Sequence, residues 1–156
     1  MEVQPTILNK LKKLWIYYIL QSLLASVALL MLILVLDKDK IVAISAMGAT
    51  SFILFAMPKS VSAQTRNVVG GHLVGLACGA IFYFTNLPYY VEYPSAVGLA
   101  IFFMVTLDVE HPPAAGTALA VTIHEVSPGV FFTIILSSVV LSQCRYYLRN
   151  YLKDLV

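Results

Sequence analysis

One uninterrupted apolar run, Leu14 to Leu36, constrains the fold of this chain more than any other feature. It contains no charged side chain, and a helix needs about 20 predominantly apolar residues to cross the hydrocarbon core of a bilayer. The run is too long for the apolar part of a secretory signal peptide and lacks a clear small-residue cleavage site. We therefore expect a membrane-spanning helix here.

The composition extends this expectation to the whole chain. Of its 156 residues, 60% are hydrophobic and 12% are charged, whereas soluble domains carry about 25% charged residues. So few charges cannot cover a soluble surface, and we expect one integral membrane domain over residues 1–156, surrounded by the lipid bilayer. The net charge of +2 is too small to indicate binding to nucleic acid. Cys78 and Cys144 both lie in apolar runs and form no disulfide or metal-binding pattern.

Five further apolar runs follow the first, and most stop at a proline or a charged residue. They are residues 41–57, 68–84, 95–107, 114–123 and 129–144. The sequence therefore predicts an all-α, polytopic membrane helix bundle with four to six membrane segments, some of them short or broken. Residues 95–107 and 114–123 are short for full crossings. They fit two crossings or, equally, a re-entrant pair that enters and leaves on the outer side.

Basic residues set the expected orientation, because cytoplasmic loops of membrane proteins carry an excess of Lys and Arg. With a cytoplasmic N-terminus, eight of the ten basic side chains fall inside, and only Lys38 and Lys40 fall outside. We expect both termini in the cytoplasm and a multi-pass protein of the plasma or inner membrane. Residues 1–13 would be a basic cytoplasmic N-terminus, residues 14–144 the membrane segments, and residues 145–156 a basic cytoplasmic C-terminus.

The chain also divides into two similar halves. Each half has a long run, a short run rich in small and hydroxyl residues, and another long run; the short runs carry Gly48–Ser51 and Ala115–Ala118. Three crossings per half would give the halves opposite orientations, as in the inverted repeats of many transporters. The residue similarity between the halves is slight, so the repeat stays an open alternative.

The segment Glu110-His111-Pro112-Pro113 places ionisable residues and two prolines between apolar runs. Proline is favoured in the first turn of a helix, and a helix that begins here would leave the N–H groups of residues 114–117 free to bind an anion. His111 would then lie at the helix mouth and add a donor or a proton. The alternative is a proline turn in which a carbonyl group satisfies the histidine, and the local chemistry favours neither.

Two other segments carry polar groups. Gly48–Ser51 can offer hydroxyl donors to an anion, or it can allow close helix packing, which is favoured. Further along, Arg66 is expected to anchor to lipid phosphates at the start of a helix, with Asn67 beside it and His72 about one turn further in. Gly71, Gly75 and Gly79 recur every four residues, and this small-residue face predicts that another helix packs very closely beside His72.

The acidic residues beside His111 allow two interpretations. Asp108 and Glu110 can stabilise a protonated His111, which would suit proton coupling, or they can be solvated at the membrane interface. A metal site drawn from His72, His111, Glu110 or His124 has no recognisable ligand spacing, so we expect none.

Taken together, these motifs resemble the HPP family of small integral membrane proteins. The motifs are Gly48-Ala49-Thr50-Ser51-Phe52, Pro58 followed by Gln64-Thr65-Arg66-Asn67, Gly70-Gly71-His72, and His111-Pro112-Pro113-Ala114 with Gly116-Thr117-Ala118-Leu119. Two positions depart from the family pattern. Thr65 stands where the family commonly has proline, and the residues just before His111, which are usually uncharged in the family, are Asp108-Val109-Glu110 here. Members of this family have been linked to nitrite transport in plastids and cyanobacteria. The resemblance therefore implies that this chain moves nitrite or a similar small anion.

We expect a transporter or channel for a small inorganic anion that works as a homo-oligomer, most simply a dimer. The substrate site is predicted to comprise Gly48, Thr50, Ser51, Asn67, His72, His111, Pro112, Pro113, Gly116 and Thr117. The main alternative is a structural or regulatory membrane subunit whose glycine face binds a partner chain. An enzyme is least favoured because no nucleophile–base pair is evident, so we expect no catalytic residue, metal or cofactor.

Overall fold

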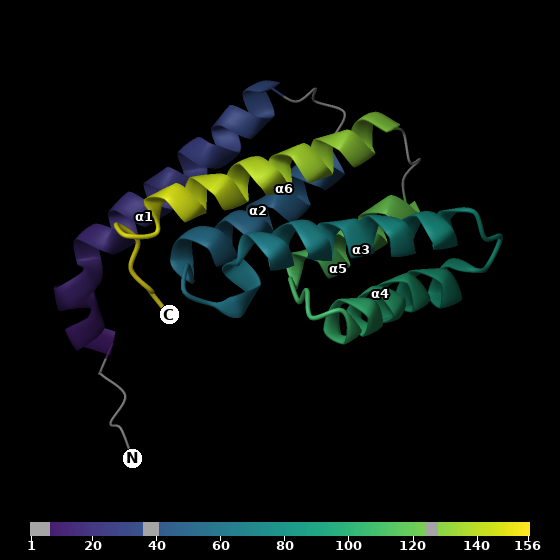
Figure 1. Cartoon of the computed structure of the whole chain (residues 1–156), viewed down its shortest axis with the longest axis horizontal. Coiled ribbons are helices and arrows are strands. Elements are labelled where there is room, and N and C mark those ends of the chain that lie inside the picture. The colour runs from purple at the N-terminus through teal and green to yellow at the C-terminus, as the bar shows by residue number, and fades with distance from the viewer. Residues whose placement is uncertain (1–6, 36–40, 124–127) are drawn as a thin grey trace, which may run out of the picture.

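The computed structural model describes residues 7–35, 41–123 and 128–156, and every regular element in these ranges is a helix (Figure 1). The elements are α1 (Ile7–Val35), α2 (Ile41–Ala56), the short 3-10 helix η2 (Val61–Ala63), α3 (Thr65–Tyr83), α4 (Tyr89–Thr106), α5 (Pro113–Ile123) and α6 (Pro128–Leu148). Each apolar run of the sequence corresponds to one α-helix. The all-α prediction is therefore confirmed for the described residues, whereas Lys38, Lys40 and His124 lie outside them.

The helices differ in length, and the difference bears on how each can sit in a bilayer. Residues Lys12–Leu34 of α1 and Pro128–Leu148 of α6 are long and apolar enough to cross a membrane. Helix α5 has only 11 residues, which extend about 16 Å at 1.5 Å per residue, roughly half of a 30 Å hydrocarbon core. The expected mixture of long and short helices is present, and the number of crossings and the inverted repeat remain predictions.

Helix α4 begins earlier than its apolar run indicated. It starts at Tyr89, not near Ser95, and has 18 residues. Glu92 and Pro94 interrupt the hydropathy, but they lie in the first two turns, where the carbonyl of Pro88 accepts hydrogen bonds from the N–H groups of Val91 (2.8 Å) and Glu92 (3.0 Å). Acidic side chains are favourable in the first turn of a helix, whereas Pro94 lies inside α4 and removes one backbone N–H from its hydrogen bonds without ending the helix. The predicted start was therefore wrong by about six residues.

Helix α3 lies at the centre of the bundle and packs against α4, α5 and α6, while α2 packs against α1, α5 and α6. Figure 1 shows α1 and α4 at opposite edges of this arrangement. The large apolar side chains of α1 are mostly exposed, among them Leu20, Leu23, Met31 and Leu34. In a bilayer such a surface faces lipid tails or another protein, so α1 is a peripheral helix.

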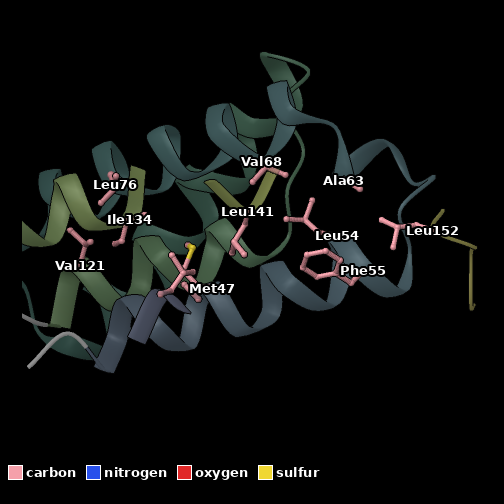
Figure 2. Packing of buried hydrophobic residues seen from close by; sticks show 12 residues of the cluster. Met47, Leu54, Phe55, Ala63, Val68, Leu76, Val121, Ile134, Leu141 and Leu152 are labelled. Carbon is pink, nitrogen blue, oxygen red and sulfur yellow. The ribbon is translucent and has the colours of Figure 1, made fainter. Parts of the chain in front are cut away.

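Buried apolar side chains of α2, α3, α5 and α6 form the larger core (Figure 2). Met47, Leu54, Leu76 and Ile134 are fully buried within it. A smaller cluster around Met104, with Cys78, Ala100, Ala114 and Ala118, fills the space between α3, α4 and α5. The many alanines of this second cluster leave little side-chain volume, and the helices there lie close together.

The C-terminal tail packs between the middle of α1 and the end of α2. The side chain of Gln21 on α1 donates to the carbonyls of Phe55 and Lys153, the latter at 2.9 Å, and accepts the N–H of Lys153 at 2.8 Å. The N–H of Leu155 also donates to the carbonyl of Ala56 at the end of α2, at 2.9 Å. The middle of α1, the end of α2 and the C-terminal tail are therefore held together, and the predicted location of both termini in the cytoplasm remains a prediction.

Candidate functional site

Helices α3 and α5 approach each other closely along the glycine face of α3. A Cβ atom at Gly71 would lie 2.7 Å from Cβ of His111, and one at Gly79 would lie 2.5 Å from the carbonyl oxygen of Ala118; one at Gly75 would overlap the carbonyl of Ala114. No side chain larger than hydrogen fits at these positions without displacing backbone. The predicted close packing is confirmed, but the partner is α5 of the same chain. The hypothesis that this face binds a partner chain is therefore wrong.

The turn between α4 and α5 is held over the N-terminal end of α3. The guanidinium of Arg66 donates to both the carboxylate and the carbonyl of Asp108, and Asn67 donates from Nδ2 to the carbonyl of Glu110 at 3.3 Å. Asp108 has a φ of 57°, a left-handed conformation that few non-glycine residues adopt. Arg66 therefore holds this turn in place as a clamp. The sequence predicted only that Arg66 anchors to lipid phosphates. Asp108 pairs with Arg66 and not with His111.

The clamped turn places His111 beside His72, and both imidazoles are 0% exposed. Oγ1 of Thr50, on α2, lies 3.0 Å from Nε2 of each histidine. At the far sides, Nδ1 of His72 lies 2.9 Å from Oγ1 of Thr117, and Nδ1 of His111 lies 2.8 Å from the carbonyl oxygen of Ser62. We call Thr117, His72, Thr50 and His111 the His–Thr chain, because their hydrogen bonds form one unbranched line that ends at Ser62.

The direction of these hydrogen bonds follows from the carbonyl at the end. A carbonyl only accepts, so Nδ1 of His111 carries the proton, and a neutral His111 then accepts at Nε2 from the hydroxyl of Thr50. The single Thr50 proton is thereby used, so His72 donates to Thr50 from Nε2 and accepts at Nδ1 from Thr117. The two neutral histidines are therefore opposite tautomers, and every donor points towards Ser62.

The start of α5 differs from the expected anion site. Pro113 is the first residue of the helix, as predicted, but the N–H of Ala114 donates to the carbonyl of His111 at 2.9 Å, and that of Ala115 donates to Pro112 at 3.1 Å. These two amides are occupied by the turn itself, so the prediction that they are free was wrong. His111 contacts Ser62 and Thr50 and does not lie at an open helix mouth. Its Nδ1 atom is paired with a backbone carbonyl, as the alternative interpretation of a proline turn expected.

A pocket of about 310 Å³ adjoins the turn on its other side, between α4 and α5. Its lining combines apolar side chains with the HPP turn: Ile101, Met104, Val105, Glu110, His111, Pro112 and Ala115. The pocket can hold a small ligand, and it reaches the His–Thr chain only through His111. Glu110 is part of this lining, whereas the sequence left two interpretations for it, solvated at the interface or close to His111.

The remaining predicted site residues are dispersed. Gly48 and Gly116 have open space beside them, and Pro112 is exposed. Ser51 is buried, and its hydroxyl has no partner among the described residues. It lines a separate hollow of about 100 Å³ with Gln21 and Ser22, on another face of α2 from Thr50. The structure thus brings together Thr50, His72, His111 and Thr117, with Asn67 supporting the turn.

Ser62 was missed by the sequence reasoning because its contribution is a backbone carbonyl, which no residue pattern marks. Glu110 was considered only as a neighbour of His111 and not as a pocket wall. Within the described ranges no three His, Cys, Asp or Glu side chains gather as a metal site would require.

Comparison with known proteins gives the chain its family. The sequence matches the family described as HPP, transmembrane region, over residues 9–154. It is also similar to two curated transmembrane proteins of Dictyostelium discoideum. One is 35% identical over 88 residues, covering 54% of this chain and 31% of the relative, and the other is 37% identical over 87 residues, covering 53% and 28%. The chain therefore spans less than a third of the length of these relatives.

No solved structure matches the chain. The family match covers nearly the whole chain and includes every residue of the His–Thr chain, the Arg66 clamp and the α3–α5 interface. This chain therefore belongs to the HPP transmembrane family.

Proposed function

We propose that this chain transports a small inorganic anion, nitrite or a similar ion, across the plasma or inner membrane, and that the His–Thr chain with its adjoining pocket is the substrate site. The observation that carries the proposal is the placement of two imidazoles and two hydroxyls, all 0% exposed, between apolar helices. Polar groups at membrane depth are costly and usually serve a substrate or ion path. The proposal includes no enzymatic reaction and no cofactor.

The position of the His–Thr chain supports this role. His72 lies seven residues after the start of α3 at Thr65, which is about 10 Å along the helix axis. A helix that enters the hydrocarbon core at its first residue would hold His72 roughly a third of the way across it. Helix α5 begins beside it and is too short to cross, so the site lies where a half-length helix meets a glycine-faced one, as in transporters with discontinuous helices.

The donor groups suit a small anion better than a large or apolar solute. Thr50 and Thr117 supply hydroxyls, and each histidine supplies one N–H; three of these donors are paired within the His–Thr chain, and the N–H of His111 is paired with the carbonyl of Ser62. An anion therefore binds by taking over one of these donors, and the acceptor that it displaces must find another partner. Glu110 lines the pocket, and a carboxylate in this region repels a doubly charged anion more strongly than a monovalent one.

We also propose that the protein works as a homodimer. Helix α1 makes its extensive contacts with α2 alone, and its exposed apolar surface offers an area that a second copy can cover. Native mass spectrometry in lipid nanodiscs tests this point: a dimer is expected, and a lone monomer that still transports would contradict it.

Flux through proteoliposomes tests the transport proposal. Uptake of nitrite, nitrate, formate, chloride and bicarbonate is measured against protein-free liposomes, for the native chain and for His111→Ala. We expect uptake of at least one of these anions, and a loss of about 100-fold in His111→Ala, since the hole left by the ring breaks the His–Thr chain. Gly98→Ala is the matched control, because nothing lies within 4 Å of the added methyl group.

Two results would contradict the proposal. Wild-type uptake by a folded His111→Ala protein would remove His111 from the transport path. An absence of flux for every anion, together with a partner chain that co-purifies reproducibly, would favour the structural or regulatory subunit instead.

A further inference from the structure

We propose that the His–Thr chain is a relay that holds one proton and couples its movement to that of the anion. The inference rests on the proposed transport function and deepens it by naming the coupling ion. It stands on four hydrogen bonds of 2.8 to 3.0 Å that link Thr117, His72, Thr50, His111 and the carbonyl of Ser62 in one line.

The geometry allows a proton to pass along the line without movement of heavy atoms. A proton that arrives at Oγ1 of Thr117 forms a new O–H bond there, while the O–H bond of Thr117 that pointed at His72 breaks and its proton forms an N–H bond at Nδ1 of His72. The N–H bond at Nε2 of His72 breaks as its proton forms a new O–H bond on Thr50. The former Thr50 proton moves to Nε2 of His111, which then carries two N–H bonds and the positive charge. One proton is added in all, and His72 ends neutral as the opposite tautomer.

The relay can hold only one proton. If both histidines were protonated, both Nε2–H groups would point at Thr50, whose own hydroxyl would find no acceptor within the chain. The two rings, with centroids 5.1 Å apart, would also carry like charges away from water. The second proton is therefore excluded by both hydrogen-bond geometry and repulsion.

The two ends of the relay differ in their access to water. Ser62 is half-buried in the connector between α2 and α3, at the end of the bundle that carries Lys59 and Arg66, whereas Thr117 is fully buried. The carbonyl of Ser62 cannot take the proton from His111, so the bond between them must open before the proton reaches water on that side. We infer that this bond is the gate of the relay.

Few ionisable groups near the relay can compensate the charge of a protonated His111. Helices α2 and α5 carry none. Arg66 and Asp108 are paired with each other in the exposed clamp, and Arg145 of α6 donates to a carbonyl of the connector. Glu110 lines the pocket beside His111. The other ionisable groups on the connector and on α3 are Lys59, exposed, Cys78, buried further along, and Tyr83, half-buried at the end of α3.

A bound anion would therefore be the main new counter-charge for the protonated relay. Anion and proton then stabilise each other's binding, and this coupling is reciprocal. One proton that moves with one monovalent anion makes the cycle electroneutral. A pH gradient should therefore drive uptake, and a membrane potential should not.

The first experiment measures tautomers, independently of transport. The full chain in lipid nanodiscs, labelled with ¹⁵N at histidine, is examined by NMR while the pH is lowered. We expect one neutral histidine with its proton on Nδ1 and one with its proton on Nε2. On acidification one ring should become doubly protonated while the other changes tautomer. Thr50→Val should abolish the coupled change, and Thr50→Ser, which keeps the hydroxyl, should restore it.

The second experiment measures coupling. Proteoliposomes that contain a pH-sensitive dye take up nitrite with or without an inward proton gradient, and with or without a potassium diffusion potential. We expect the gradient to accelerate uptake about tenfold, within the range of typical coupling between two sites, with one proton per nitrite and no effect of the potential.

The outcomes separate the two proposals. Nitrite uptake that ignores the pH gradient would overturn the relay and leave transport intact. Identical tautomers, or simultaneous protonation of both rings, would overturn the relay whatever the flux. The predicted tautomer change without flux of any anion would instead refute the transport function and limit the relay to proton binding.

Discussion

The two sides of the bundle are built differently. Between α3 and α5, glycines bring the backbones together, and polar side chains from three helices bind one another. Between α2 and α6, side chains such as Met47, Leu54 and Ile134 fill the space with hydrocarbon (Figure 2). We call the α3–α5 interface the glycine side and the α2–α6 interface the apolar side. The glycine side has a fixed geometry because its backbones are in contact, whereas side chains on the apolar side can change rotamer to accommodate a substitution. We therefore expect stability and function to respond very differently to changes on each side.

The largest effect is expected from Gly75→Ala. The added methyl group would overlap the carbonyl of Ala114 and lie 3.4 Å from the N–H nitrogen of Ala118, both backbone atoms that cannot turn aside. We expect the free energy of unfolding to fall by about 3 kcal/mol, the upper part of the usual range for overpacking. Unfolding by sodium dodecyl sulfate in mixed micelles measures it. Gly98→Ala is again the control, and equal stability of the two variants would show that α3 and α5 are not in close contact.

A smaller effect is expected from Thr50→Val, compared with Ser51→Ala next to it. Valine has the shape of threonine but leaves the Nε2 atoms of His72 and His111 without their common partner. The loss should be about 2 kcal/mol, as for buried polar groups left unsatisfied. The Ser51 hydroxyl has no partner among the described residues, so its removal should cost nothing. The same micelle titration compares the two, and a larger loss in Ser51→Ala would reverse the assignment of the faces of α2.

The smallest effect is expected on the apolar side, from Ile134→Val. Ile134 is fully buried in the larger core, and removal of one methyl group there costs about 1 kcal/mol. Neighbouring side chains can shift to reduce the cavity. Thermal inactivation in nanodiscs should change little, and a loss as large as that of Gly75→Ala would mean that the apolar side is packed as rigidly as the glycine side.

The sequence predicted the helices well and the site only in part. The six apolar runs correspond to the six α-helices of the described residues, because a helix in lipid needs a long apolar stretch. The glycine spacing predicted that another helix packs closely against α3, but it did not identify that helix as α5. The start of α4 was missed because Glu92 and Pro94 lower the local hydropathy without ending a helix. Hydropathy along the chain is a local property of the sequence. It therefore locates apolar helices correctly, and it misplaces a helix end wherever polar residues or proline lie inside the helix.

The sequence could not predict that the side chains of the His–Thr chain come together, and the reason is a different one. Thr50 and Ser51 are adjacent and chemically alike, but about 100° of helix rotation separates their side chains. Which of them faces His72 depends on how α2 docks against α3 and α5. The carbonyl of Ser62 carries no residue-specific signal at all, although it alone sets the direction of every hydrogen bond in the chain.

Nitrite uptake by Thr50→Val and Ile134→Val, measured side by side in proteoliposomes and normalised to folded protein, tests the central claim most directly. Both variants alter a few atoms of one fully buried side chain, one in each side of the bundle. If the His–Thr chain is the transport site, Thr50→Val should lose about tenfold or more of its uptake, while Ile134→Val stays within about twofold of the native chain. Equal uptake by the two variants would contradict the claim that transport depends on the His–Thr chain.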